Sequence, residues 1–394
     1  MKLLLPCDNY LYRYKGELYA KSQEEYDLFK RYIRIFDTLR MVARCATVNE
    51  LKPTYVPITE KRIEIITVPM FSGPVQFLKC FPEIRECIKN IFQDVDAGML
   101  RLPSIVGSYI GFNMIRKQIP YATENLYDSQ DGYRSSEKFS EKVLWRLMDF
   151  FQRHLCYKAD GVSCVTEFYM QRRYFSKKGD CFSSHYSTLA LYPSFYTHER
   201  KFPSQKTSFS IVHIANPVVT KGRKGHEEMI KMLKKVTDSE LDVKINFIGS
   251  GTDSEIAKLI KLAKESGVED KIKFLGYLSK TEIHRCLLDS DLYVMPTKAE
   301  GLPRVVIEAM SVGLPCISSR ISGLPELLDN HFLTEYHDVD TLSKLVIELL
   351  TTPELYEKTS RENFEKSKKY ENTALELRRD AFYSSLKDVV LKSN

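Results

Sequence analysis

Residues 292–318 read LYVMPTKAEGLPRVVIEAMSVGLPCIS, and this stretch decides the fold class. It opens with an apolar run, Leu292–Met295, and passes through a polar loop into Pro303–Val312, whose apolar residues recur at helical spacing. A second apolar run follows at Cys316–Ser318. Short strands that alternate with helices indicate a parallel α/β sheet, in which ligands bind in the loops that follow the strands.

The same alternation continues on both sides of this stretch. In residues 206–365 we expect the strands Phe209–Ile214, Lys244–Ile248 and Lys271–Phe274 and the helices Lys224–Val236, Asp253–Ser266 and Thr281–Asp289. In residues 1–205 we expect the strands Lys2–Pro6, Arg40–Val48, Ile63–Pro69, Met99–Leu102, Tyr121–Leu126 and Gly161–Val165 and the helices Glu24–Leu39, Ile105–Arg116, Glu137–Tyr157 and Glu167–Arg173. The alternation of strands and helices in both halves therefore predicts two Rossmann-like domains.

The chain is long enough for two domains. Its 394 residues suit two hydrophobic cores of about 150–200 residues each. Residues 183–208 are rich in Ser, Thr, Pro and His, which is typical of a linker. We predict a first domain at 1–205, a second at 206–365, and a C-terminal helical segment at 366–394 that packs back across the first.

Positive charge is concentrated in the first half. Residues 1–205 carry 30 Lys and Arg against 23 Asp and Glu, whereas residues 206–394 carry 28 against 29. We expect the first half to meet something anionic, such as a phospholipid surface or a phosphate-bearing acceptor, and a merely solvated basic surface is the alternative. Nucleic acid is not expected, because no basic stripe is interleaved with aromatic residues and no nucleic-acid-binding motif is present.

The cysteines and the N-terminus suggest a cytoplasmic protein. The nine cysteines form no Cys-x-x-Cys pair and no cluster with histidine, which favours reduced thiols and argues against structural zinc. Only three consecutive apolar residues precede Pro6, and no run reaches the roughly 18 residues of a membrane span. We therefore expect a cytoplasmic protein that is not integral to a membrane.

Two loops after predicted strands differ in how strongly they indicate a ligand. Residues 216–226, NPVVTKGRKGH, place three cations and two glycines at a helix start, where free backbone N–H groups already favour anions. A solvated basic turn is the alternative. The second loop, Gly249-Ser-Gly251, lacks the third glycine of a dinucleotide fingerprint, so a nicotinamide cofactor is not expected.

The third loop carries two glutamates. Glu300 lies just before the helix that Pro303 should begin, and Glu308 lies inside it between apolar neighbours. Glu308 could pair with Arg304, at a gain of only about 0.3–0.5 kcal/mol, or accept hydrogen bonds from the two hydroxyls of a ribose.

These features together resemble one family. Glu300 and Glu308, with seven residues between them and Gly313-Leu-Pro following, resemble the signature of retaining group 1 glycosyltransferases of the GT-B fold. Residues 271–278 resemble the base-binding strand and turn of that family, and Lys224-Gly resembles its diphosphate site. The resemblance covers residues 209–350. In the first half, stretches such as Arg101-Leu-Pro-Ser-Ile-Val-Gly107 are loosely similar to members that build surface polysaccharides.

The resemblance implies a fold and a set of roles. The fold would be α/β GT-B, two Rossmann-like domains facing across a cleft, with the acceptor bound by the first and the nucleotide sugar by the second. Lys224, Arg223 and Glu300 would be catalytic, with the cations on the diphosphate and Glu300 on the donor sugar. The donor would further contact Glu308 through its ribose, as well as Gly301, Leu302, Arg304, Gly276, Tyr277, Leu278, Gly249 and Lys221. On the acceptor side, the nearest candidates are Asp128, Asp131 and Gly107.

The implied activity is transfer of a sugar from a nucleotide-diphosphate sugar to an acceptor hydroxyl, with retention at C1. The acceptor would be a glycan or a lipid-linked species, met at the inner face of a membrane. The resemblance implies no metal and no cofactor, because the basic loop can do the work of a cation. Asp289-Ser-Asp291 spells a metal-binding Asp-x-Asp motif, but it precedes a strand and is typical of a turn. A sugar-nucleotide epimerase or phosphorylase on the same architecture, and a catalytically silent binding scaffold, are the alternatives.

Overall fold

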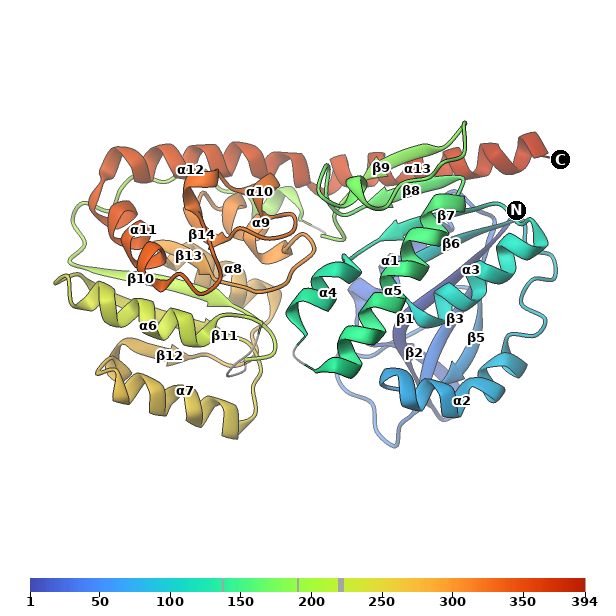
Figure 1. The fold of residues 1–394 in the computed structure, drawn as a ribbon, viewed down its shortest axis with the longest axis horizontal. Coiled ribbons are helices and arrows are strands. Elements are labelled where there is room, and N and C mark those ends of the chain that lie inside the picture. The colour runs from blue at the N-terminus through green and yellow to red at the C-terminus, as the bar shows by residue number, and fades with distance from the viewer. Residues whose placement is uncertain (137, 190, 219–222, 394) are drawn as a thin grey trace. The chain divides into compact units, whose positions relative to one another are not determined.

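The computed structural model describes residues 1–136, 138–189, 191–218 and 223–393, and it divides into two compact units (Figure 1). The first unit comprises Met1–Tyr186 together with Leu377–Asn394, and the second comprises Ser187–Glu376. Each unit is built on its own twisted sheet with helices packed against it.

The sheet of the first unit is parallel except at one end of its first strand. Its parallel strands lie in the order β5-β3-β1-β6-β7-β8-β9. Their bounds are β1 Lys2–Tyr14, β3 Thr38–Thr47, β5 Ile63–Pro69, β6 Ala97–Leu102, β7 Tyr121–Asn125, β8 Gly161–Cys164 and β9 Phe182–His185. The far end of β1 pairs antiparallel with β2 (Glu17–Ala20), which in turn pairs with β4 (Val56–Pro57).

Helices cover both faces of this sheet. They are α1 Gln23–Tyr32, α2 Gly73–Cys87, α3 Ile105–Lys117, α4 Ser129–Ser135 and α5 Phe139–Lys158. Neighbouring residues of a strand point to opposite faces, and β7 shows the result. Thr123 contacts the thiol of Cys156 on α5, whereas Glu124 accepts a hydrogen bond from Tyr32 of α1 on the other face.

Several elements of the first unit differ from the sequence-based expectation. The helix expected to reach Leu39 ends at Tyr32, and Leu39 itself lies in strand β3, which begins at Thr38. The helix expected at Glu167–Arg173 is a turn with one short 3-10 segment, Met170–Arg172. Part of the expected linker is strand β9, and helix α2 was not expected at all. Residue 137, where α5 was expected to begin, lies outside the described residues.

The second unit follows the predicted alternation closely. Its parallel strands lie in the order β12-β11-β10-β13-β14-β15. Their bounds are β10 Ser208–Ile214, β11 Asp242–Ile248, β12 Ile272–Phe274, β13 Leu292–Met295, β14 Cys316–Ser319 and β15 Leu333–Thr334. The principal helices are α6 His226–Thr237, α7 Asp253–Glu265, α8 Lys280–Asp289, α9 Arg304–Ser311, α11 Val339–Thr351 and α12 Pro353–Ser367. Buried aliphatic side chains from β10, β11, α6 and α11 form the core.

The two units divide at Tyr186 and Ser187, earlier than the boundary expected near residue 205. The residues after Ser187 belong with the second unit because their polar groups are satisfied there. Arg200 donates from Nε to the carbonyl of Val312 at 2.8 Å, and the Tyr196 hydroxyl donates to the carbonyl of Ser367 at 2.9 Å.

The C-terminal helix α13 (Asn372–Ser393) contributes Leu377 onward to the first unit. Its Tyr383 hydroxyl donates to Glu124 at 2.8 Å, and the same carboxylate accepts from Tyr32 at 2.6 Å and from Tyr186 at 2.9 Å. Three tyrosines from α1, α13 and the chain after β9 therefore meet on one buried carboxylate.

Candidate active site

The loops after β10 and β13 meet at the carboxyl edge of the second sheet. These strands are neighbours, with Ile211 opposite Leu292, so their following loops emerge side by side. The ammonium of Lys224, from the first loop, lies 2.5 Å from a carboxylate oxygen of Glu300, from the second. Both side chains are partly exposed, at 26% and 16%. The structure thus brings together the two residues to which sequence assigned the leading roles.

A threonine holds the two loops together. The Thr297 hydroxyl lies 2.7 Å from the carbonyl oxygen of Arg223 and 3.3 Å from Glu300 Oε1. The Lys298 amide donates to the same Arg223 carbonyl at 2.7 Å. Arg223 therefore joins the site through its backbone, while its side chain is exposed. Thr297 was not predicted, although a hydroxyl three residues before Glu300 at a strand end is a signal that could have identified it.

Glycine is required where the basic loop enters α6. Gly225 has φ +75°, and a Cβ at this position would lie 1.7 Å from the carbonyl oxygen of Pro296. The helix begins at the next residue, His226. Lys224 therefore stands at the amino end of α6, where the helix dipole and free N–H groups add to its positive charge. An anion bound at this point would interact with both the Lys224 ammonium and the amino end of α6.

Two histidines lie buried beneath the basic loop. His213 of β10 and His226 pack with ring centroids 4.8 Å apart, and both are at most 1% exposed. His213 Nδ1 lies 2.8 Å from the carbonyl oxygen of Val294. Burial lowers the pKa of His213 to about 4, and burial, His213 and Lys224 lower the pKa of His226 to about 2. Both rings are therefore neutral at physiological pH, so they add no positive charge beneath the loop.

The glycines after β11 and β12 are joined directly. The Gly249 amide donates to the carbonyl of Gly276 at 2.9 Å. Gly249 has φ +147°, and a Cβ there would lie 1.9 Å from the carbonyl oxygen of Ala215. Beside Gly276, Tyr277 is 74% exposed and Leu278 is half-buried. These backbone groups line the edge of the sheet beyond β10.

The remaining predicted donor residues surround the start of α9. Pro303 is the N-cap of this helix and not its first helical residue, so α9 begins at the exposed Arg304. The carbonyl of Gly301 accepts from the Gly323 amide at 3.0 Å, and Leu302 is buried. Glu308 is half-buried between Ile307 and Ala309. Lys221 lies outside the described residues.

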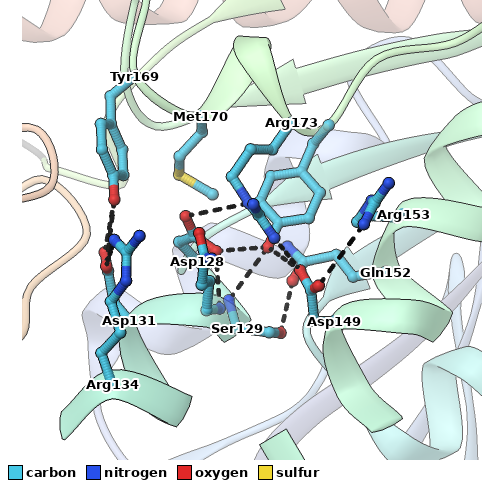
Figure 2. A network of polar contacts seen from close by, with 12 residues as sticks. Asp128, Ser129, Asp131, Arg134, Asp149, Gln152, Arg153, Tyr169, Met170 and Arg173 are labelled. Atoms are coloured by element: carbon cyan, nitrogen blue, oxygen red, sulfur yellow. Dashed lines mark hydrogen bonds and ion pairs between the residues drawn. The ribbon is translucent and has the colours of Figure 1, made fainter. Parts of the chain in front are cut away.

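The acceptor-side candidates lie in the first unit, within a polar network (Figure 2). Asp128 caps α4 by accepting from the Gln130 amide at 2.8 Å, and it accepts from the Tyr174 hydroxyl at 2.6 Å. Burial and Asp128 together raise the pKa of Tyr174 far above its usual value. Asp131 accepts from the Tyr169 hydroxyl at 3.1 Å. Both carboxylates already have partners that hold them in place.

The third acceptor-side candidate, Gly107, lies in the first turn of α3. Its amide donates to the Ser104 side chain at 2.8 Å, and a Cβ on Gly107 would approach that side chain to 3.0 Å. Packing alone is a sufficient reason for glycine here. The role of all three acceptor-side residues stays a prediction.

Asp289 is the last residue of α8 and Asp291 immediately precedes β13, so the Asp-x-Asp stretch spans the expected helix-to-strand turn. Asp291 accepts from Lys206 Nζ at 2.7 Å and from the Ser210 amide at 2.8 Å. In the part of the chain that the structure describes, His, Cys, Asp and Glu side chains nowhere gather in a group that could hold a metal ion. Within those same residues, every helix is too short or too polar to cross a membrane.

A family model matches most of the second unit. Residues 200–366 match the family described as glycosyl transferases group 1. The matched segment lies inside the second unit and contains Lys224, Glu300 and Glu308. The match supports a group 1 glycosyltransferase.

Individual proteins resemble the chain over its whole length. Protein CapJ of Staphylococcus aureus is 22% identical over 390 residues, which are 99% of this chain and 97% of CapJ. The structure is similar to sucrose-phosphate synthase of Thermosynechococcus elongatus (TM-score 0.72, 15% identity, 98% of this chain and 99% of that one). It is also similar to Anabaena HepE in complex with UDP and glucose (TM-score 0.68, 15% identity, 98% and 100% covered). The predicted GT-B class with two Rossmann-like α/β domains is confirmed.

Proposed function

We propose that the protein transfers a sugar from a nucleotide-diphosphate sugar to an acceptor hydroxyl. The observation that carries this proposal is the Lys224–Glu300 pair, which lies at the carboxyl ends of β10 and β13 inside the family-matched segment. Parallel α/β sheets bind their ligands at this edge. The similarity to HepE, which was solved with UDP and glucose, supports a donor of the same chemical class.

The proposed chemistry stabilises the leaving group. As the bond between the sugar and the diphosphate breaks, negative charge grows on the diphosphate and the sugar becomes cationic. In this proposal, Lys224 and the amino end of α6 stabilise the negative charge that develops on the diphosphate. Donor binding exchanges the Lys224–Glu300 contact for one between Lys224 and phosphate, which leaves the Glu300 carboxylate for the hydroxyls of the donor sugar.

Retention at C1 is part of the proposal and rests on the resemblance around Glu300 and Glu308. Slow hydrolysis of the donor, followed by NMR, tests it. A retaining enzyme first releases the anomer that the donor carries, and first release of the opposite anomer would contradict retention.

Metal independence is likewise proposed. In this proposal, Lys224 and the amino end of α6 supply the positive charge that a metal would otherwise provide to the diphosphate. Enzyme treated with a chelator should keep its hydrolysis rate. Loss of activity that is restored by a divalent cation would overturn this point.

On the acceptor side we propose a glycan or lipid-linked hydroxyl, as in cell-surface polysaccharide or glycolipid assembly, at the cytoplasmic face of a membrane. Its support is the excess of positive charge in residues 1–205 and the loose likeness of that half to surface-polysaccharide enzymes. Acceptors are screened once the donor is known, because the enzyme transfers a sugar only when the donor is bound.

Incubation with a panel of labelled nucleotide sugars separates the functional classes. Release of free sugar from one donor supports transfer, since water then takes the place of the acceptor. Conversion of one nucleotide sugar into another would instead support an epimerase. Stabilisation by a donor without any turnover would support a silent scaffold, because a ligand that binds only the folded state raises its stability.

A further inference from the structure

The outer face of α5 is apolar, which is unusual for a surface helix. Its most exposed apolar side chains are Phe139, Val143, Leu147, Phe150 and Tyr157, with exposures of 81, 52, 47, 61 and 41%. They recur every three, four or seven residues, so they share one side of the helix. The opposite side is buried against the sheet through Met148, Gln152, Leu155 and Cys156. Helix α5 is therefore apolar on both sides, and only one of them is covered by its own unit.

Cations flank this apolar stripe. The sequence of α5 contains Lys142, Arg146, Arg153 and Lys158 against two acids. One of these acids, Asp149, is held by Arg173 at 2.7 Å and also lies 4.0 Å from Arg153 of α5, so its charge is neutralised within the unit (Figure 2). The face that α5 presents to solvent is thus apolar along its centre and positive along its margins.

A hollow opens beside the carboxyl-terminal half of the stripe. Its volume is about 520 Å³, and aromatic and basic side chains line it. The aromatic ones are Phe150, Tyr157 and Phe175, and the basic ones include Arg153, Lys158 and Lys177. A phosphate ester with an attached hydrocarbon matches this mixture, because the cations suit the phosphate and the rings suit the chain.

We propose that the outer face of α5 is a docking surface for an anionic lipid bilayer. The apolar stripe enters the boundary between headgroups and acyl chains, the flanking cations contact the anionic headgroups, and the hollow receives a lipid phosphate. A second copy of the chain fits this face less well. A symmetric pairing would set its basic margins against each other, and like charges there would repel.

The α5 face differs from the surface that the clustering of basic residues in the sequence would suggest. The cations Arg172, Arg173, Lys177 and Lys178 stand together in the sequence, but they do not all face outward. Arg173 is 26% exposed and bound to Asp149 and Asp128, while Lys178 lies 2.6 Å from Asp160. Of the four, Arg173 and Lys177 line the hollow beside α5, and Lys177 is the exposed one that belongs to the docking surface.

Co-sedimentation with vesicles tests the docking surface. The protein should bind vesicles that contain phosphatidylglycerol, bind weakly to pure phosphatidylcholine, and lose affinity as salt rises. Phe139→Ser with Phe150→Ser, and separately Arg146→Gln with Arg153→Gln, should each lower binding roughly tenfold. The matched control, Leu377→Ser with Leu391→Ser on α13, removes equally exposed apolar side chains elsewhere in the same unit and should bind as the wild type does.

Two results would overturn the proposal. One is equal vesicle binding by the wild type and both α5 variants, or no binding to anionic vesicles at all. The other is a stable dimer in sedimentation velocity that the α5 phenylalanine variant dissociates, which would make a second copy the occupant. The inference deepens the proposed function by naming its lipid partner, yet vesicle binding and donor hydrolysis are separate readouts. Either can fail alone, and thermal unfolding confirms that each variant is folded.

Discussion

At the scale of single residues, the site depends on charges and backbone positions that sequence patterns reveal only in part. The spacing of Glu300 and Glu308 and the Lys-Gly pair could be recognised because each is a local pattern within a few residues of the start of a helix. The contact of Lys224 with Glu300 joins residues 76 positions apart, so no local pattern predicts it, and Thr297, which contacts Glu300, was not predicted either. The buried histidines were also unforeseen, since one of them simply continues an apolar strand.

Gly225 should be the least replaceable residue of the basic loop. Gly225→Ala adds a Cβ 1.7 Å from the Pro296 carbonyl and also strains the positive φ, so we expect weaker donor binding and a loss of unfolding free energy above about 1–2 kcal/mol. Gly267→Ala is the control, because its φ of +70° is similar but its surroundings are open. Equal losses in the two variants, measured by chemical denaturation, would show that the contact with Pro296 does not matter.

The histidine pair should make the protein acid-sensitive. In the folded chain the pKa values of His213 and His226 lie at about 4 and about 2, below the usual 6.5, because both rings are buried. Below pH 6.5 these two histidines bind protons in the unfolded chain but stay neutral in the folded chain until the pH nears their lowered pKa values. Stability is therefore full above that pH and falls as the pH drops, at a slope that approaches about 1.4 kcal/mol per pH unit for each histidine.

Replacing His226 with leucine removes one of these titrations. His226→Leu should flatten the decline in unfolding free energy between pH 6.5 and 4, whereas His198→Gln, at an exposed histidine, should leave it unchanged. Thermal or urea unfolding over that pH range measures both slopes. The same steep slope in the leucine variant and the wild type would rule out His226 as a source of acid sensitivity.

At the scale of elements, prediction succeeded where apolar periodicity was clear. Strands β5 and β13 match their expected bounds, and α7 differs by one residue. Prediction failed where short polar and aromatic stretches become ordered only through tertiary contacts. Strand β9 (Phe182–His185) forms by pairing with the edge of β8. The residues of β9 alone do not indicate a strand.

Glu124 of β7 joins elements that are far apart in the chain. Tyr383→Phe on α13 removes one of its three tyrosine donors without creating a large cavity. We expect a loss of about 1.5–3 kcal/mol in unfolding free energy, because the hydrogen bond is made to a buried carboxylate. Tyr277→Phe, at an exposed position, should change stability little. Urea unfolding measures both variants, and an unchanged midpoint for Tyr383→Phe would show that this contact does not stabilise the first unit.

At the scale of the whole molecule, the two halves differ in what sequence could say of them. The second unit was predicted nearly element by element, because its candidate donor-site motifs and its strand spacing both indicate the same alternation of strands and helices. For the first unit, the positive charge was visible in composition, but the surface that carries it was not. Selecting the α5 face requires knowing which cations are paired inward and which apolar side chains remain uncovered.

The central claim is that Lys224 and Glu300 hold the donor and help to cleave it. The most direct test compares hydrolysis rates of the preferred nucleotide sugar by the wild type, Lys224→Ala and Glu300→Ala. The control is Lys234→Ala, at an exposed lysine of α6 that pairs with Asp238, the C-cap residue of the same helix. We predict that the first two variants lose roughly 100-fold or more in rate while the control keeps the wild-type rate. Wild-type hydrolysis by Lys224→Ala and Glu300→Ala would contradict the assignment of the site.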